Sequence, residues 1–204
     1  MAITGTLTGT PSAFKNAQQG PWKVGTTLYA LMSDGTAQLQ MFRSTDNGAT
    51  WGNPVAYSSS GVIESFAGTL AGTLIHTIET TTGSTFQIRT YDTANNTWSA
   101  ALVTVGTAVA SSVATGSRQV AIAYDSTADT LLVGWSSATT RIMGTDYRRV
   151  SFGRYFRGTA NWSAYVDPFG SAAIHYDLAG AINGAGTCHM LVAEQNPSLS
   201  TNSL

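Results

Sequence analysis

Three segments of the sequence end in a tryptophan that follows a turn, and their recurrence restricts the fold more than any other feature. These tryptophans are Trp51, Trp98 and Trp162. Each follows a run of alternating apolar and polar residues, the pattern of a β-strand with one buried face. The first two are 47 residues apart, and four-stranded units of repeat proteins recur every ~40–50 residues. The spacing therefore predicts a repeated all-β architecture.

The first of these segments is the octapeptide Ser-Thr-Asp-Asn-Gly-Ala-Thr-Trp at residues 44–51. Asp and Asn before Gly tolerate left-handed backbone and hydrogen-bond their own main chain, so they favour a compact hairpin turn. The segment resembles the Asp-box of sialidases and related β-propellers, Ser/Thr-x-Asp-x-Gly-x-Thr-Trp, at Ser44, Asp46, Gly48, Thr50 and Trp51. The resemblance implies a structural turn on the outer rim of a blade. Ligand or calcium binding by Asp46 is the alternative interpretation.

Two later segments are degenerate versions of the same box. In residues 91–98, Thr93 stands where the first box has its Asp, and Asn95 replaces its Gly. The same segment is equally similar to a stretch of kelch repeats, which also form propellers. Residues 155–162 match more loosely.

We therefore expect one all-β domain over residues 1–204, with β-propeller-like blades of antiparallel strands. About three and a half blades are predicted, at residues 20–57, 62–105 and 117–166 with a partial blade at 170–194, followed by a polar tail at 195–204. The predicted strands are Thr26–Ser33, Thr36–Arg43, Pro54–Tyr57, Gly72–Thr80, Thr85–Tyr91, Gln119–Tyr124, Thr130–Ser136, Tyr147–Phe156, Ala172–Tyr176 and Thr187–Glu194. Extra residues between Trp98 and Trp162 are assigned in part to residues 137–146.

The sequence does not determine how the predicted blades close into a propeller ring. Propellers use ~4–8 blades, so one chain supplies four at most, with a strand at Ile3–Leu7 as the candidate to complete the last. Alternatively the ring closes between chains, because an unfinished blade leaves an edge that needs a partner.

The composition is that of a turn-rich β-protein with little surface charge. Charged residues make up 10 %, against about a quarter in typical domains. Either partners cover much of the surface or Thr and Ser supply a neutral one. A net charge of −1 leaves no footprint for nucleic acid. The basic patch Arg148, Arg149, Arg154 and Arg157 is split between two strand faces, which favours a solvated or subunit-contacting role. The single cysteine, Cys188, excludes an intrachain disulfide.

The sequence shows no signal peptide and no apolar stretch of membrane-spanning length. We expect the protein in the cytoplasm of the producing cell or in a virion.

The resemblance to sialidases implies three arginines that grip a carboxylate, a tyrosine nucleophile paired with Glu, and an Asp acid/base. Arg118 alone lies where an inner-strand arginine is expected, and neither Glu64 nor Glu79 is singled out as a tyrosine's partner. The Tyr-Asp pairs at 91–92, 124–125 and 176–177 are interpreted as caps of strand ends. The three histidines lack metal-ligand spacing. We predict no catalytic residues, no metal and no cofactor.

Three function classes follow from the sequence. The first is a non-enzymatic structural or interaction protein, a bacteriophage virion component (tail, fibre or capsid accessory) that self-associates or binds other virion proteins. The alternative is a lectin-like propeller that binds cell-surface glycan, with Arg118 and the aromatic residues Trp22, Trp135 and Tyr165 as candidate ligand-binding residues. This role needs the three aromatic side chains to be exposed, whereas core packing explains most of them more simply. The third is a sialidase-type glycosidase.

Overall fold

A computed structural model describes the chain at residues 18–33, 39–57, 63–81, 86–99, 103–104, 120–142, 145–163, 174–182 and 188–195. Within these ranges every regular element is a β-strand, and none is a helix. All strand pairs are antiparallel. The described part of the chain is therefore all-β, as the sequence predicts.

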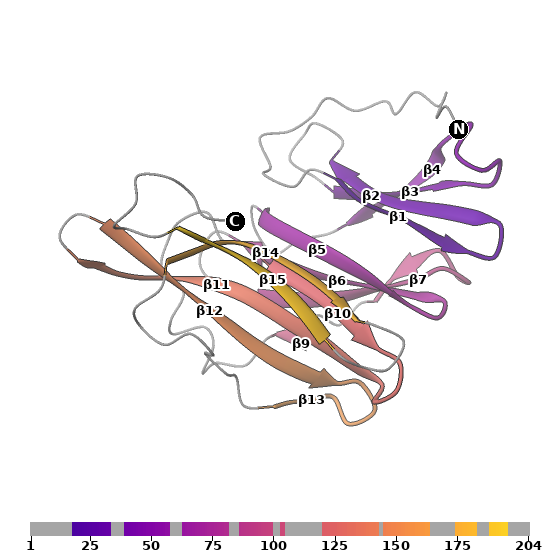
Figure 1. Cartoon of the computed structure of the whole chain (residues 1–204). Coiled ribbons are helices and arrows are strands. Elements are labelled where there is room, and N and C mark those ends of the chain that lie inside the picture. Colours follow the sequence, from indigo (N-terminus) through magenta and orange to yellow (C-terminus); the bar gives the residue numbers. More distant parts are fainter. Residues whose placement is uncertain are drawn as a thin grey trace.

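Blade 1 is a four-stranded sheet in which each strand pairs with the next along the chain. Its strands are β1 (Gln18–Val24), β2 (Thr27–Ser33), β3 (Leu39–Ser44) and β4 (Gly52–Tyr57). The first box forms the turn between β3 and β4 (Figure 1).

Blade 2 repeats this order with one additional strand. It contains β5 (Ile63–Ala71), β6 (Leu74–Thr81), β7 (Phe86–Asp92) and β8 (Thr97–Trp98), and β9 (Val103–Thr104) also pairs with β7. The second box lies between β7 and β8, the same place that the first box has in blade 1.

Blade 3 contains β10 (Val120–Asp125), β11 (Thr130–Ile142), β12 (Thr145–Phe156) and β13 (Asn161–Trp162). The third box connects β12 with β13. A terminal hairpin of β14 (Ile174–Ile182) and β15 (Cys188–Gln195) forms a two-stranded sheet.

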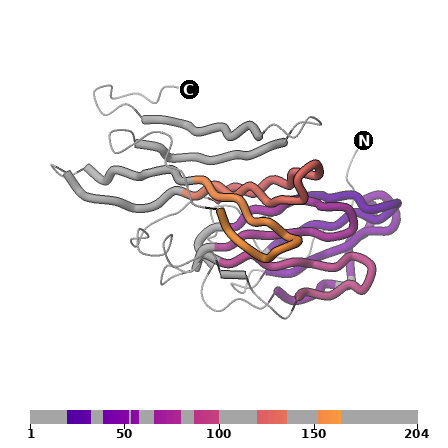
Figure 2. The backbone as a smooth tube through the Cα atoms, turned by 90° about the horizontal axis from the view of Figure 1, so that it is seen from below, coloured from indigo at the N-terminus to yellow at the C-terminus, as the bar shows by residue number. Residues whose placement is uncertain are grey.

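The sheets stack through their first strands. β1 lies against β5, β5 against β10, and β10 against β14. Figures 1 and 2 show blades 1, 2 and 3 following one another. The terminal hairpin contacts blade 3, because β14 lies against β10, β11 and β12. This succession is that of consecutive propeller blades.

Blade 2 packs on both neighbours because alternate side chains of a strand point to opposite faces. Along β6, Ile75, Thr77 and Glu79 face blade 1, whereas His76 and Ile78 face blade 3. The blade 1–2 seam is the cluster of buried residues Tyr29, Leu31, Leu39, Met41, Tyr57, Phe66, Ile75 and Tyr91.

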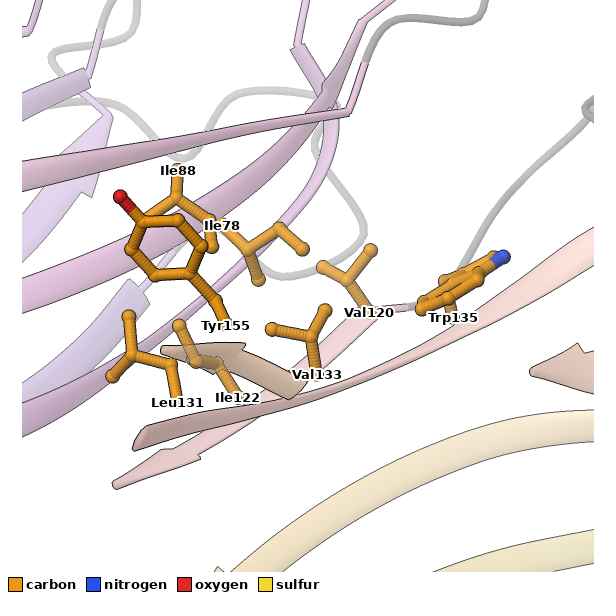
Figure 3. Packing of buried hydrophobic residues seen from close by; sticks show 8 residues of the cluster. All are labelled: Ile78, Ile88, Val120, Ile122, Leu131, Val133, Trp135 and Tyr155. Atoms are coloured by element: carbon orange, nitrogen blue, oxygen red, sulfur yellow. The ribbon is translucent and has the colours of Figure 1, made fainter. Parts of the chain in front are cut away.

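The blade 2–3 seam is a second cluster of buried residues. Blade 2 contributes Ile78 and Ile88, and blade 3 contributes Val120, Ile122, Leu131, Val133, Trp135 and Tyr155. Figure 3 shows the isoleucines of blade 2 directed toward the side chains of blade 3. Burial of these apolar side chains is the main term that holds the two blades together.

The three box tryptophans lie on the corresponding face of their blades, the face opposite the one that packs on the next blade along the chain. Trp98 of blade 2 packs in the blade 1–2 seam and Trp162 of blade 3 in the blade 2–3 seam. Trp51 packs with Ala30, Met32 and Phe42 on the face of blade 1 opposite the blade 1–2 seam. In blades 2 and 3 the box tryptophan therefore contributes to the packing against the preceding blade.

The first strands of blades 1 and 2 were not predicted from the sequence. β1 contains Gly20-Pro21, a dipeptide typical of turns, and β5 contains Gly68 among small residues. The residues assigned to an insertion at 137–146 instead belong largely to strands, because β11 continues to Ile142 and β12 begins at Thr145. The predicted strand at Ile3–Leu7 and the tail at 195–204 lie outside the described residues, except for the last residue of β15.

Gly68 is a point of close approach between blades 1 and 2. A Cβ at this position would lie 2.5 Å from Cζ2 of Trp22, while Gly158 has open space around it. We expect Gly68→Ala to lower the free energy of unfolding by about 1–3 kcal/mol, because the indole has to move out of the seam. Gly158→Ala, the matched control, changes it by less than about 0.5 kcal/mol.

Chemical denaturation measures both effects. In a Trp22→Leu background, the cost of Gly68→Ala is expected to shrink, since the two positions are in contact. An equal cost in both backgrounds would show that the indole is not the obstacle.

Candidate functional site

The turn at residues 44–51 is organised around one carboxylate. Asp46 Oδ1 accepts hydrogen bonds from the Ser44 hydroxyl (2.7 Å) and the Thr50 amide (2.8 Å), and Oδ2 accepts one from the Thr50 hydroxyl. The Ser44 hydroxyl oxygen in turn accepts the Gly48 amide at 2.8 Å. Asn47 and Gly48 have φ of 59° and 91°, which an Asn-Gly pair adopts readily. All fixed polar positions of the box are thus engaged within the turn.

These hydrogen bonds favour the charged form of Asp46. Those from the Thr50 side chain and backbone contribute most and lower the pKa of the carboxyl to about 2. The carboxylate therefore remains ionised, with its acceptor oxygens directed into the loop.

The second and third boxes share a turn geometry that differs from the first. In each, the residue two before the tryptophan has positive φ, 53° at both Asn96 and Ala160. The serine after each tryptophan closes the turn: Ser99 Oγ accepts the Thr90 amide and Ser163 Oγ accepts the Arg154 amide.

The aspartates of the Tyr-Asp pairs hold turns. Asp92 Oδ1 accepts the amides of Ala94 (2.8 Å) and Asn95 (3.4 Å). Its pKa is lowered mainly by the hydrogen bond from the Asn95 side chain. Asp125 Oδ1 likewise accepts the amides of the residues two and three positions later. The third pair, at 176–177, has side chains outside the described residues.

An ionic cluster lies at the turn between β10 and β11. Arg157 pairs with Asp129, whose Oδ1 also accepts the Tyr124 hydroxyl at 3.1 Å. The guanidinium carbon of Arg157 lies over the Tyr124 ring, 5.3 Å from its centroid. Arg157 thus bridges the third box and the β10–β11 turn. Of the predicted basic patch, Arg154 is exposed, and the side chains of Arg148 and Arg149 are outside the described part.

A polar cluster is buried inside the blade 1–2 seam. Glu79 is 0 % exposed, Tyr57 3 % and Arg89 9 %. The guanidinium carbon of Arg89 lies 5.1 Å from the centroid of the Tyr57 ring. Burial and the nearby Glu79 charge raise the pKa of Tyr57 well above its usual value. This is a buried Tyr, Glu and Arg grouping that the sequence did not single out.

The predicted ligand-binding residues do not gather at one described surface. Trp22 is half-buried against the blade 1–2 seam, with its ring over Gly68. The exposure of Trp135 that the lectin interpretation requires is not found: the side chain is 1 % exposed and belongs to the blade 2–3 seam. Arg118 and Tyr165 lie outside the described residues.

Two kinds of feature are absent from the described ranges. No group of three or more His, Cys, Asp or Glu side chains there is arranged to hold a metal ion. No helix in this part of the chain is long and apolar enough to cross a bilayer.

Comparison with solved structures identifies similar folds at low sequence identity. A sialidase, NanB, from Streptococcus pneumoniae has a TM-score of 0.61 at 16 % identity, covering 88 % of this chain and 27 % of the sialidase. An α-L-arabinanase from Penicillium chrysogenum, complexed with arabinobiose, has a TM-score of 0.59 at 13 % identity, covering 96 % and 63 %. An α-L-arabinofuranosidase from Fusarium graminearum has 0.57 at 12 %, covering 95 % and 62 %.

These similarities establish the fold and nothing finer. The chain has a β-propeller-like architecture, and it spans less than two thirds of each of these structures. No protein-family model matches the sequence, and a search of curated proteins finds no match.

The Asp46 carboxylate offers a direct test of the turn. We expect Asp46→Ala to speed hydrogen exchange at the Thr50 amide roughly tenfold, because that amide loses a charged acceptor. Asp46→Asn, which keeps one acceptor oxygen, should have a smaller effect.

The pH dependence has a defined sign. The folded pKa of Asp46, about 2, is below the ordinary 3.8, so its contribution to stability is complete above pH 3.8 and is lost as pH falls through 2. NMR titration of the Asp46 carboxyl measures this, and a midpoint at or above 3.8 would contradict the described hydrogen bonds.

Proposed function

We propose that the chain is a non-enzymatic structural or interaction protein that works by association, and that its setting is a virion, as a bacteriophage tail, fibre or capsid accessory component. The observation that carries the non-enzymatic part is the use of acidic side chains. Most glycoside hydrolases need two carboxyl groups that face the scissile bond, and the sialidase type needs an Asp acid/base and a Glu beside its tyrosine nucleophile.

The structure describes five of the eleven acidic side chains, and all five are engaged by the fold. Asp46, Asp92 and Asp125 accept turn amides. Asp129 pairs with Arg157, and Glu79 is fully buried. The carboxylates of blades 1 to 3 therefore support turns and seams in the described part of the chain.

The terminal hairpin supports the associative part of the proposal. The described sheet β14–β15 has two strands, whereas the other sheets have four or five. The backbone edge of β15 has no partner among the described strands, and such edges pair readily with another chain. We infer that a second copy or another virion protein completes this sheet. The low charge of the sequence is consistent with a surface that partners cover.

The virion setting is the most specific part of the proposal, and it rests on the sequence. Few charged residues and a single cysteine suit a component assembled inside the producing cell.

A lectin-like propeller is the second candidate, favoured by the sugar-processing enzymes among its structural neighbours. Among the residues with described exposure, the only exposed large hydrophobic side chain is Phe156, at 38 %. Sugar stacking would therefore depend on Trp22 and on residues such as Tyr165, outside the described part.

Enzyme activity is tested with fluorogenic sialosides and arabinofuranosides. We expect purified protein to release no fluorophore above the buffer rate. Turnover that is lost in Glu79→Gln, with the fold retained by circular dichroism, would overturn the non-enzymatic assignment.

A glycan array tests the second candidate. We expect no binding by the wild-type chain. Binding that disappears in Trp22→Leu, but persists in the distant Trp51→Leu, would favour the lectin over the structural protein.

A further inference from the structure

His76 is a buried titratable side chain that the proposed function does not use. It lies in the middle of β6, on the face directed toward blade 3, and is 4 % exposed. Its Nδ1 hydrogen-bonds the Thr90 hydroxyl of β7 at 2.9 Å. Its Nε2 is buried and has no hydrogen-bond partner among the described residues. A neutral imidazole can leave one ring nitrogen unprotonated at modest cost, whereas an imidazolium has to bury a second N–H and a charge.

The charged groups that act on His76 come from blade 3. Arg157, after β12, and Asp129, before β11, both influence its protonation. These two residues form the ion pair that also holds Tyr124 of β10. Within blade 2, its cross-strand neighbours are Thr69 on β5 and Thr90 on β7, neither of which is charged.

Asp129 cannot fully compensate a charge on His76. Its Oδ1 already accepts hydrogen bonds from both Arg157 and Tyr124. A protonated imidazole would therefore meet the Arg157 cation together with a carboxylate whose charge is already shared. The seam accommodates the neutral ring and opposes the charged one.

We propose that His76 makes the blade 2–3 seam sensitive to acid: the uncharged imidazole keeps the seam closed, and protonation loosens blade 3 from blade 2. Ile78, the next residue after His76 on the same face of β6, belongs to the apolar cluster of this seam. A charge introduced at His76 is thus placed at the margin of the contact that joins the two blades.

The electrostatics agree in sign with this geometry. Burial, and then the positive charge of Arg157, lower the pKa of His76 from 6.5 to about 4, while Asp129 opposes them. Because the open form binds the proton more tightly, the closed form is destabilised as pH falls from 6.5 toward 4. Above pH 6.5 the histidine is neutral in both forms and exerts no such effect.

Hydrogen exchange measured by mass spectrometry tests the proposal on the full chain. After correction for intrinsic rates, protection of the β6 and β10 amides is expected to fall roughly 20-fold between pH 7 and pH 5, from the two pKa values. Amides of β2 and β3 in blade 1 are the internal reference and should change much less. The matched variant His76→Gln keeps a polar contact to Thr90 but cannot be protonated, so it should lose this difference.

Arg157→Gln provides a second variant at a partly exposed position. Removing the cation near the imidazole should reduce the acid effect without abolishing it. A pH effect on β6 and β10 that is unchanged in His76→Gln would overturn the proposal, as would an equal loss of protection in blade 1.

A measurement on the wild-type protein keeps the proposal testable if a variant does not fold. The chain has three histidines, and NMR titration follows each imidazole. One of them is expected to remain neutral at pH 5. Titration of all three near pH 6.5 would exclude a histidine held neutral by the seam.

Discussion

The two-sided packing of blade 2 is the constraint on which the rest of the structure depends. Because side chains alternate across a strand, one residue in two along β6 faces blade 1 and the others face blade 3. Ile75 packs in the blade 1–2 seam, and Ile78 packs in the blade 2–3 seam. A one-residue slip of β6 would exchange the two faces and place Glu79 and His76 in the wrong seams.

Polar side chains are built into these seams and into the turns that border them. Glu79 and Arg89 are buried beside Tyr57, and His76 is buried beside the Arg157–Asp129 pair. Replacing buried ionisable groups by apolar residues of similar volume is often neutral or stabilising, so we interpret these groups as contributing to register more than to net stability. In the described part of blades 1 to 3, the acidic side chains accept hydrogen bonds from turns, pair with Arg157 or lie in the blade 1–2 seam.

The sequence predicted the all-β class, the hairpin blades and the places of all three boxes, because period-2 alternation and Asn/Asp/Gly turns are local signals. It missed β1 and β5 because Gly20-Pro21 and Gly68 are turn-like residues locally. Their places are determined by contacts between blades, such as the one between Trp22 and Gly68. For the same reason the sequence left open whether Trp135 is exposed or packed in the core: its burial depends on residues of blade 2 that are distant in sequence. The grouping of Tyr57, Glu79 and Arg89 joins two blades, and no spacing along the chain indicates it.

The central claim is that these blades serve association, with the sheet of the terminal hairpin completed by another chain. Native mass spectrometry of the purified protein, together with its elution volume over a range of concentrations, tests this most directly. The account predicts a defined oligomer of the 21.3 kDa chain. A concentration-independent monomer that binds no particle component would contradict it.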